Sequence, residues 1–173
     1  MIVVADSGPL QYLVRIGAID VLAPLYQRVL LPQTVACELQ QNNTPTLVRV
    51  WIAQPPAWCE IRPDPPADPT LAFLDPGERV AIPLALSVRA DRLLIDDLAG
   101  RAEANRRRLR VTGTVGVLID AHWASLLDFE QALAQLRQTN LYLSNEVIAL
   151  ARQELSSGER KIVSVIHEPS FRH

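Results

Sequence analysis

The chain of 173 residues carries 17 basic and 19 acidic side chains, which give a formal net charge of −2, and 49% of its residues are hydrophobic. This composition excludes an intrinsically disordered chain and is sufficient for the core of one ordinary domain. The near-neutral charge argues against a surface that captures nucleic acid wholesale, although it leaves room for a local basic patch.

The cysteines and the hydropathy pattern argue against two further classes of protein. Cys37 and Cys59 form neither a metal-binding motif nor a disulfide framework, so we expect buried thiols in a reducing cytosol. The stretch MIVVADSGPL lacks the basic region of a secretory signal, and no apolar segment approaches the ~20 residues that cross a bilayer. We therefore expect a cytoplasmic protein without a membrane segment.

The first part of the chain predicts strands that alternate with helices. The β-branched stretch IVVA predicts a strand, and DSGP after it predicts a helix start with Asp6 or Ser7 as the capping residue. We expect further strands over residues 28–32 and 58–61 and helices over residues 10–26, 33–41 and 47–53, the first of them broken near Gly17. Seven of the 13 prolines lie within residues 54–76, which therefore predict a loop inside one domain.

The second part of the chain continues this alternation. Asp75 as the cap and Pro76 in the first turn predict a helix over residues 75–90. Strands are expected over residues 92–96 and 110–113, and helices over residues 98–109, 114–128, 129–138 and 144–155. The pattern predicts a three-layer α/β/α sandwich with a mainly parallel central sheet. We expect one domain over residues 1–155 and a tail or arm over residues 156–173.

Five acidic residues lie where such a sheet binds ligands, beyond the carboxyl ends of its strands. They are Asp6 at the end of the first strand, Asp96 and Asp97 at the end of the strand over residues 92–96, and Glu38 and Glu78 on the intervening helices. Each has a structural explanation by itself, such as helix capping by Asp6 or Asp97. Gathered at one edge, however, they would repel one another unless a cation joined them.

The ligand chemistry of these acids favours a hard divalent cation. Oxygen-only ligands suit Mg²⁺ or Mn²⁺. The histidines lie far from the acids in the sequence, which argues against zinc. A carboxylate-held Mg²⁺ suits phosphate chemistry, because it lowers the pKa of a bound water and neutralises charge on the phosphate.

The chain resembles the PIN-domain ribonucleases, which include the VapC toxins of bacterial toxin–antitoxin pairs, and within them a prokaryotic PIN-like branch. The resemblance rests on five stretches in the family's order: VVADSGPLQYLVRIGAIDVL, VLLPQTVACEL, LDPGERVAIPLAL, LLIDDLAGRAEANRRRLRVTGTVGVL and LYLSNEVI. It implies a metal-dependent endonuclease that cleaves single-stranded RNA with water as the nucleophile. It also implies a small antitoxin partner and a homodimer.

Carried over residue by residue, the resemblance implies that Asp6, Glu38, Glu78 and Asp97 are catalytic and hold one or two Mg²⁺ or Mn²⁺ ions, with Asp96 as a further metal ligand. We expect the carboxylates of Asp6, Glu38 and Asp97 to lie within a few ångströms of one another. The match favours Asp97 as the direct ligand and leaves Asp96 as a cap or a ligand through water. Pro83 lies inside the helix predicted over residues 75–90, where a proline costs ~3 kcal/mol. A kink or a later start of this helix would move Glu78.

A basic cluster follows the acids, at Arg101, Arg106, Arg107, Arg108 and Arg110. Arg101, Arg107 and Arg108 are the candidates for holding the RNA backbone beside the metal site. The alternative is a solvated helix face that is paired with Glu103.

Three rival functions fit parts of the sequence. A signalling receiver domain needs a lysine after its last core strand, but the sole lysine, Lys161, lies in the tail. A dinucleotide-binding Rossmann domain needs G-x-G-x-x-G after the first strand, where this chain has DSGP. A non-catalytic PIN-like module that binds RNA or a protein stays open as the alternative to the nuclease.

Overall fold

The computed structural model describes residues 1–159, and its centre is a sheet of five strands. The strands are β1 (Ile2–Ala5), β2 (Arg28–Pro32), β3 (Cys59–Arg62), β4 (Arg92–Leu94) and β5 (Val111–Thr112). Every neighbouring pair is parallel, in the order β3-β2-β1-β4-β5. The predicted α/β/α sandwich is confirmed, and its sheet is parallel throughout.

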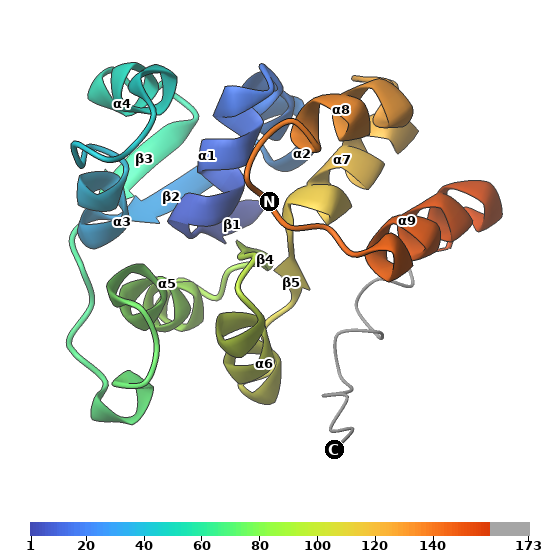
Figure 1. Cartoon of the computed structure of the whole chain (residues 1–173). Helices are drawn as coiled ribbons and strands as arrows, with labels where there is room; N and C mark the ends of the chain where they lie inside the picture. Colours follow the sequence, from blue (N-terminus) through green and yellow to red (C-terminus); the bar gives the residue numbers. More distant parts are fainter. Residues whose placement is uncertain (160–173) are drawn as a thin grey trace.

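Helices cover both faces of this sheet (Figure 1). Helices α5 (Pro76–Ser87) and α6 (Leu98–Arg106) lie on one side. The other side carries α1 (Ser7–Arg15), α2 (Leu22–Tyr26), α7 (Thr114–Trp123) and α8 (Phe129–Leu136), and α9 (Asn145–Ser157) packs against α7. Helices α3 (Gln33–Glu38) and α4 (Thr46–Ala53) lie between β2 and β3 in the chain, and 3₁₀ turns lie at Ile19–Val21 and Pro69–Leu71.

The strands are buried on both faces because successive side chains enter different cores. Val3 and Ala5 pack with the side chains of α1 and α7, whereas Val4 packs with those of α5. On β4, Leu94 packs in the same core as Val3 and Ala5, and Leu93 packs in the same core as Val4. Because both faces are filled with apolar side chains, the edge beyond the carboxyl ends of the strands is where the sheet can present polar groups to a ligand.

Helix α5 begins where the sequence predicts, at Pro76 after the N-cap residue Asp75. Its backbone continues through Pro83 as far as Ser87. Glu78 therefore occupies the third helical position, and of the two alternatives, a kink or a later start, the later start does not occur.

The last helix extends slightly beyond the predicted end of the domain. Helix α9 runs to Ser157, so the boundary expected after residue 155 falls within it. The predicted arm lies mostly in residues 160–173, outside the described residues. Within the described range, no helix combines the length and the apolar character that crossing a membrane requires.

Candidate active site

The predicted acids come together at one edge of the sheet because all of its strands point the same way. Asp6 follows β1 and Asp96 closely follows β4, so both leave the carboxyl ends of neighbouring strands. Glu38 lies in the last turn of the short helix that follows β2. Glu78 lies in the first turn of α5, whose other end leads back to the start of β4. The topology therefore places these four side chains around the end of β1.

Asp6 is a buried acid with an unused oxygen. Its backbone N–H donates to the carbonyl of Leu94 at 2.9 Å, which fixes it beside the end of β4. The residue is 7% exposed, and its Oδ1 has no hydrogen-bond partner among the described residues. Burial raises the pKa of Asp6 to about 7; the Ser7 backbone N–H opposes this rise, and neighbouring carboxylates, Glu38 first among them, add to it. The fold thus holds a carboxylate whose negative charge is not compensated.

A gap beside Gly77 brings Asp6 and Glu38 together. A Cβ atom at residue 77 would stand 2.8 Å from Oδ1 of Asp6, and 2.7 and 3.0 Å from the two carboxylate oxygens of Glu38. Three carboxylate oxygens therefore surround one small volume that only glycine leaves open. Oxygens in this arrangement repel one another, and a divalent cation removes the repulsion.

Glu78 encloses the same region from helix α5. It is 3% exposed, and its Oε2 accepts the backbone N–H of Asp75 at 3.3 Å. Burial first of all, together with the charges of Asp97 and Asp6, raises the pKa of Glu78 to about 8. Glu78 is therefore a second acid whose charged form the metal-free fold disfavours.

The two adjacent aspartates have different contacts. Asp96 accepts two hydrogen bonds from Thr114, one from the backbone N–H to Oδ1 and one from the hydroxyl to Oδ2, both at 2.7 Å. Burial raises the pKa of Asp96, and its charge in turn raises that of Asp6. Asp97 is exposed, and its Oδ2 accepts the backbone N–H groups of Ala99 and Gly100 at 2.9 and 3.1 Å. Thus Asp96 is anchored to the first residue of α7, whereas Asp97 caps α6.

These contacts change the geometry that the sequence predicted. Among the described residues, no three His, Cys, Asp or Glu side chains are grouped closely enough to hold a metal ion by themselves. The expected convergence of Asp6, Glu38 and Asp97 is therefore not observed, because Asp97 is turned toward the first turn of α6. Which of the five acids bind metal stays a prediction, and Asp6 with Glu38 is the pair that the fold brings to one point.

Two adjoining hollows open beside the acids. The first has a volume of about 450 Å³, and it is lined by Asp6, Glu38, Asp75, Glu78 and polar side chains such as Gln11, Gln41 and Asn43. The second has a volume of about 540 Å³ and shares Asp6, Ser7, Asp75 and Glu78 with the first. In the part of the chain that the structure describes, the first hollow has no cationic lining residue, and Arg101 is the one arginine or lysine that lines the second. An RNA phosphate entering the first hollow would therefore meet carboxylates and neutral polar side chains, but no positive charge from the described residues.

Of the three arginines that the sequence proposed for RNA, Arg101 is the one at the acids. It lies in the first turn of α6 and is 4% exposed. Its Nη1 donates to the carbonyl of Ile95 at 3.1 Å, and its buried Nε has no hydrogen-bond partner among the described residues. Burial lowers the pKa of Arg101, while the charge of Asp96 raises it.

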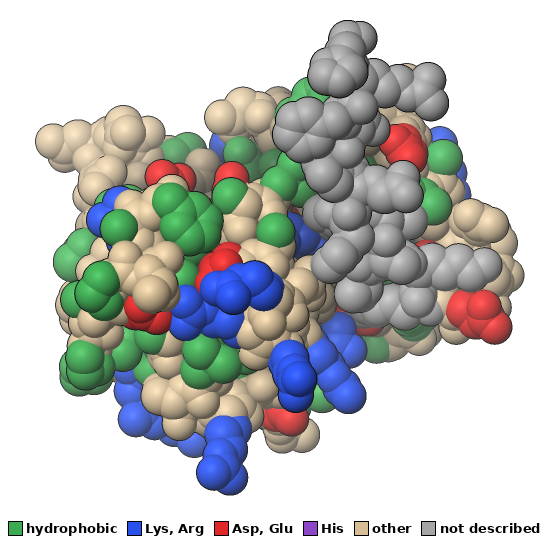
Figure 2. Space-filling model, turned by 90° about the horizontal axis from the view of Figure 1, so that it is seen from below, with side chains coloured by type: hydrophobic (Ala, Val, Ile, Leu, Met, Phe, Trp, Pro, Cys, Tyr) green, Lys and Arg blue, Asp and Glu red, His purple; other side chains and the backbone are tan. Residues whose placement is uncertain are grey.

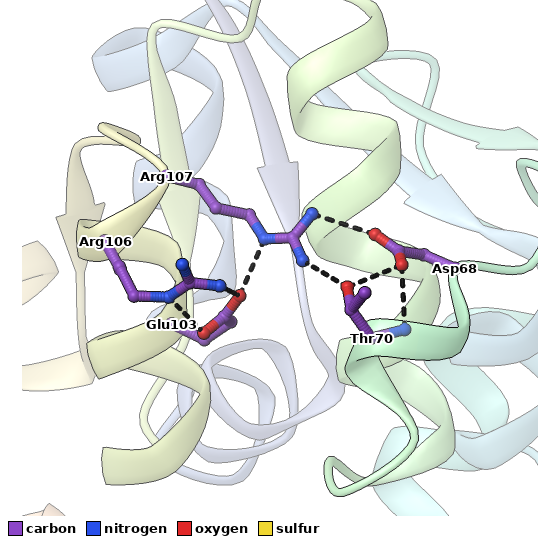
Figure 3. A network of polar contacts seen from close by, with 5 residues as sticks. All are labelled: Asp68, Thr70, Glu103, Arg106 and Arg107. Carbon is purple, nitrogen blue, oxygen red and sulfur yellow. Dashed lines mark hydrogen bonds and ion pairs between the residues drawn. The ribbon is translucent and has the colours of Figure 1, made fainter.

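Arg107 is engaged in a polar network with Glu103, Asp68 and Thr70 (Figure 3). Its guanidinium contacts Glu103 at 2.7 Å, Asp68 at 2.9 Å and the hydroxyl of Thr70 at 2.8 Å. Arg106 pairs with the same glutamate at 2.7 Å, and together the two arginines lower the pKa of Glu103 to about 2. The network connects α6 with the proline-rich loop, so these residues have a structural use without RNA.

Arg108 lies at the opposite edge of the sheet from the acids. Helix α6 starts at the carboxyl edge and ends near the amino end of β5, and Arg108 follows that end of the helix. On the face that Figure 2 shows, the arginine side chains lie in several separate groups and form no continuous basic patch. The structure therefore does not place Arg107 or Arg108 beside the acids that follow the strands, and their role in RNA binding stays a prediction.

Sequence reasoning missed two residues that shape this edge. Thr114 donates to both carboxylate oxygens of Asp96. Its position directly after the predicted strand that ends in VTG could have indicated that it lies at this edge of the sheet. Gly77 makes the gap for Asp6 and Glu38, but a glycine in the first turn of a helix gives no sign of the side chains that will face it.

Comparisons with known proteins show which family the chain belongs to. A PIN-domain family model matches residues 2–157. A solved structure of a PilT N-terminus domain protein from the archaeon Sulfolobus solfataricus is 12% identical, with a TM-score of 0.49 over 83% of this chain and 100% of that one. No curated protein matches the sequence. Because the family model covers most of the chain, the protein belongs to the PIN-domain family.

Proposed function

We propose that the protein is a Mg²⁺- or Mn²⁺-dependent endoribonuclease that hydrolyses phosphodiester bonds of single-stranded RNA at the acidic edge of the sheet. The observation that carries the proposal is the meeting of Asp6 and Glu38 at Gly77, with a buried Asp6 oxygen that has no partner in the described structure. Membership of the PIN-domain family supports it.

The donor set fits a small hard cation. Mg²⁺ is commonly bound by one or two protein carboxylates together with waters and substrate phosphates, so a cage of three protein ligands is not required. Asp6 and Glu38 would hold the ion, and Asp96 and Glu78 would add negative charge around it. When bound, the ion would lower the pKa of a water and neutralise charge on the phosphate.

The chain's own residues prepare the site for that task. The two hydrogen bonds from Thr114 hold Asp96 in one orientation next to Asp6. Glu78 is held by the backbone of its own helix, and Asp97 stabilises the start of α6, which carries Arg101. These contacts fix the acids before substrate arrives, which favours catalysis because little rearrangement is then needed.

The proposal includes the partners that the family implies. We propose a small antitoxin protein and a second copy of this chain as partners, and a role as the toxin of a toxin–antitoxin pair. Co-purification of the tagged protein with the product of a neighbouring short reading frame tests the antitoxin.

Cleavage of RNA by Glu38→Gln tests the proposed function. The substitution keeps the size of the side chain and removes the charge, so we expect Mn²⁺-dependent cleavage of a mixed-sequence single-stranded RNA to fall at least about 100-fold, or about 2.7 kcal/mol of transition-state stabilisation. Glu146→Gln is the matched control, because Glu146 is an exposed acid at the start of α9, outside both hollows.

Two results would contradict the nuclease. Cleavage by Glu38→Gln at the rate of Glu146→Gln would show that the observed activity does not use this site. A wild-type protein that binds RNA but never cleaves it, with either metal ion, would favour the non-catalytic binding module instead.

A further inference from the structure

We infer that the second hollow is a subsite for one unpaired nucleobase of the RNA, that of a nucleotide next to the cleaved phosphodiester. The inference rests on the proposed function and adds the part of the substrate that this surface recognises. It assigns Tyr142, in the loop before α9, as the side chain on which the base stacks.

The walls of the second hollow suit a flat, largely apolar ring. They are lined by Tyr12 of α1, Leu98 of α6 and Val115 of α7, and by Leu141, Tyr142 and Leu143 from the loop before α9. The volume of about 540 Å³ lies in the range of ligand pockets, which are mostly apolar with few polar groups. Aromatic and aliphatic walls with a wet opening favour a base rather than a phosphate or a sugar.

The exposure of two of these side chains has no explanation in the fold itself. Tyr142 is 87% exposed and Leu98 is 65% exposed, although both border a hollow. Large apolar side chains at the opening of a pocket are typical of binding surfaces. A tyrosine on a loop offers its ring face to a base, which is how proteins commonly bind single-stranded nucleic acid.

The position of the hollow relates it to the cleavage site. Asp6, Ser7, Asp75 and Glu78 form walls of both hollows, so a base in the second would belong to a nucleotide whose phosphate reaches the acids. Among the described residues, Arg101 is the cationic group that lines the second hollow, and its buried Nε has no partner there. Its donors complement an anionic phosphate or an acceptor edge of the base, where the acidic hollow alone would repel RNA.

Substrates that lack one base test the inference. Once the cleavage position in a short single-stranded RNA is mapped, each nucleotide beside it is replaced in turn by an abasic one, and kcat/KM is measured. For the wild type we expect a loss of about 5- to 150-fold at one of these positions, the range for one base stacked on an aromatic ring. Tyr142→Ala should show a similar loss on the intact RNA, and almost no further loss on that abasic RNA.

Two variants separate stacking from a general effect on the fold. Tyr142→Phe should retain cleavage close to wild type, because the ring remains. Phe73→Ala, which removes another exposed aromatic ring outside both hollows, should cleave intact RNA like wild type. If removal of the base lowers kcat/KM of Tyr142→Ala by the same factor as that of the wild type, the base does not stack on Tyr142 and the inference is wrong.

A binding readout distinguishes this inference from the proposed function. The fluorescence anisotropy of labelled intact and abasic RNA with Glu38→Gln reports binding without cleavage. Weaker binding of the abasic RNA supports the subsite even if the wild type proves inactive. Equal binding of both RNAs, with wild-type cleavage intact, would overturn the subsite and leave the nuclease standing.

Discussion

Replacing Asp6 with Asn is expected to lower Mn²⁺-dependent RNA cleavage at least about 100-fold, which is about 2.7 kcal/mol of transition-state stabilisation. The same change should make the metal-free protein more stable. Both effects have one physical cause, because the fold buries the carboxyl group of Asp6, disfavours its charged form and leaves its Oδ1 without a partner in the described structure. The measurements are the cleavage rate and the melting temperature in EDTA.

The stability of the metal-free protein should depend on pH with a defined sign. The pKa of Asp6 is raised from 3.8 to about 7, so folding favours its protonated form. Stability is therefore lost as the pH rises from about 4 through 7, and Glu78, with a pKa of about 8, extends the loss to higher pH. The shift of Asp6 corresponds to at most about 4 kcal/mol, and each kcal/mol changes the melting temperature of a protein of this size by about 2–4 °C.

Asp6→Asn should remove the Asp6 part of this pH dependence, and Mn²⁺ should restore stability at pH 8 in the wild type alone. Asp20→Asn serves as the matched control, because Asp20 is an exposed acid outside both hollows. If Asp6→Asn and Asp20→Asn gave the same melting curves at pH 5 and pH 8, the burial of an ionised Asp6 would not be a cost to the fold.

Replacing Gly77 with Ala is expected to weaken Mn²⁺ binding at least about 10-fold and to reduce cleavage with it, although no acid is removed. The new methyl group would stand within 3.0 Å of one oxygen of Asp6 and both carboxylate oxygens of Glu38. Glu38 would have to turn away, because its side chain is the flexible partner. Alanine is a better helix former than glycine, so the change should not greatly destabilise α5.

The affinity for Mn²⁺ is measured by titration calorimetry. Pro76→Ala is the neighbouring control, because it changes the adjacent residue of α5 without adding atoms. Unchanged Mn²⁺ affinity in Gly77→Ala, in a protein that melts like the wild type, would show that the metal is held elsewhere.

The fold was predictable from the sequence because its signals are local and consistent. The β-branched stretch at residues 2–5 and the Asp-Pro start of α5 each specify an element without knowledge of the rest. The position of Asp6 was predictable for a related reason, since a parallel sheet always gathers the residues that follow its strands at one edge.

The different contacts of Asp96 and Asp97 could not be predicted in this way. They depend on Thr114, which is 18 residues away from Asp96 and donates to both of its oxygens, and on the backbone N–H groups that Asp97 caps. The arginines show the same limit. Arg101 and Arg108 are seven residues apart on almost one helical face, yet one is buried at the acids and the other lies beyond the far end of α6.

The proposed nuclease requires that these carboxylates hold a divalent cation during RNA cleavage. The most direct measurement is the rate of cleavage of single-stranded RNA by the wild-type protein in EDTA and after stepwise addition of Mn²⁺, with Asp6→Asn purified in the same way. We expect no cleavage in EDTA, recovery that saturates with Mn²⁺ in the wild type, and no recovery in Asp6→Asn. Cleavage that persists in EDTA, or that recovers equally in both proteins, would show that these carboxylates do not hold a required metal ion.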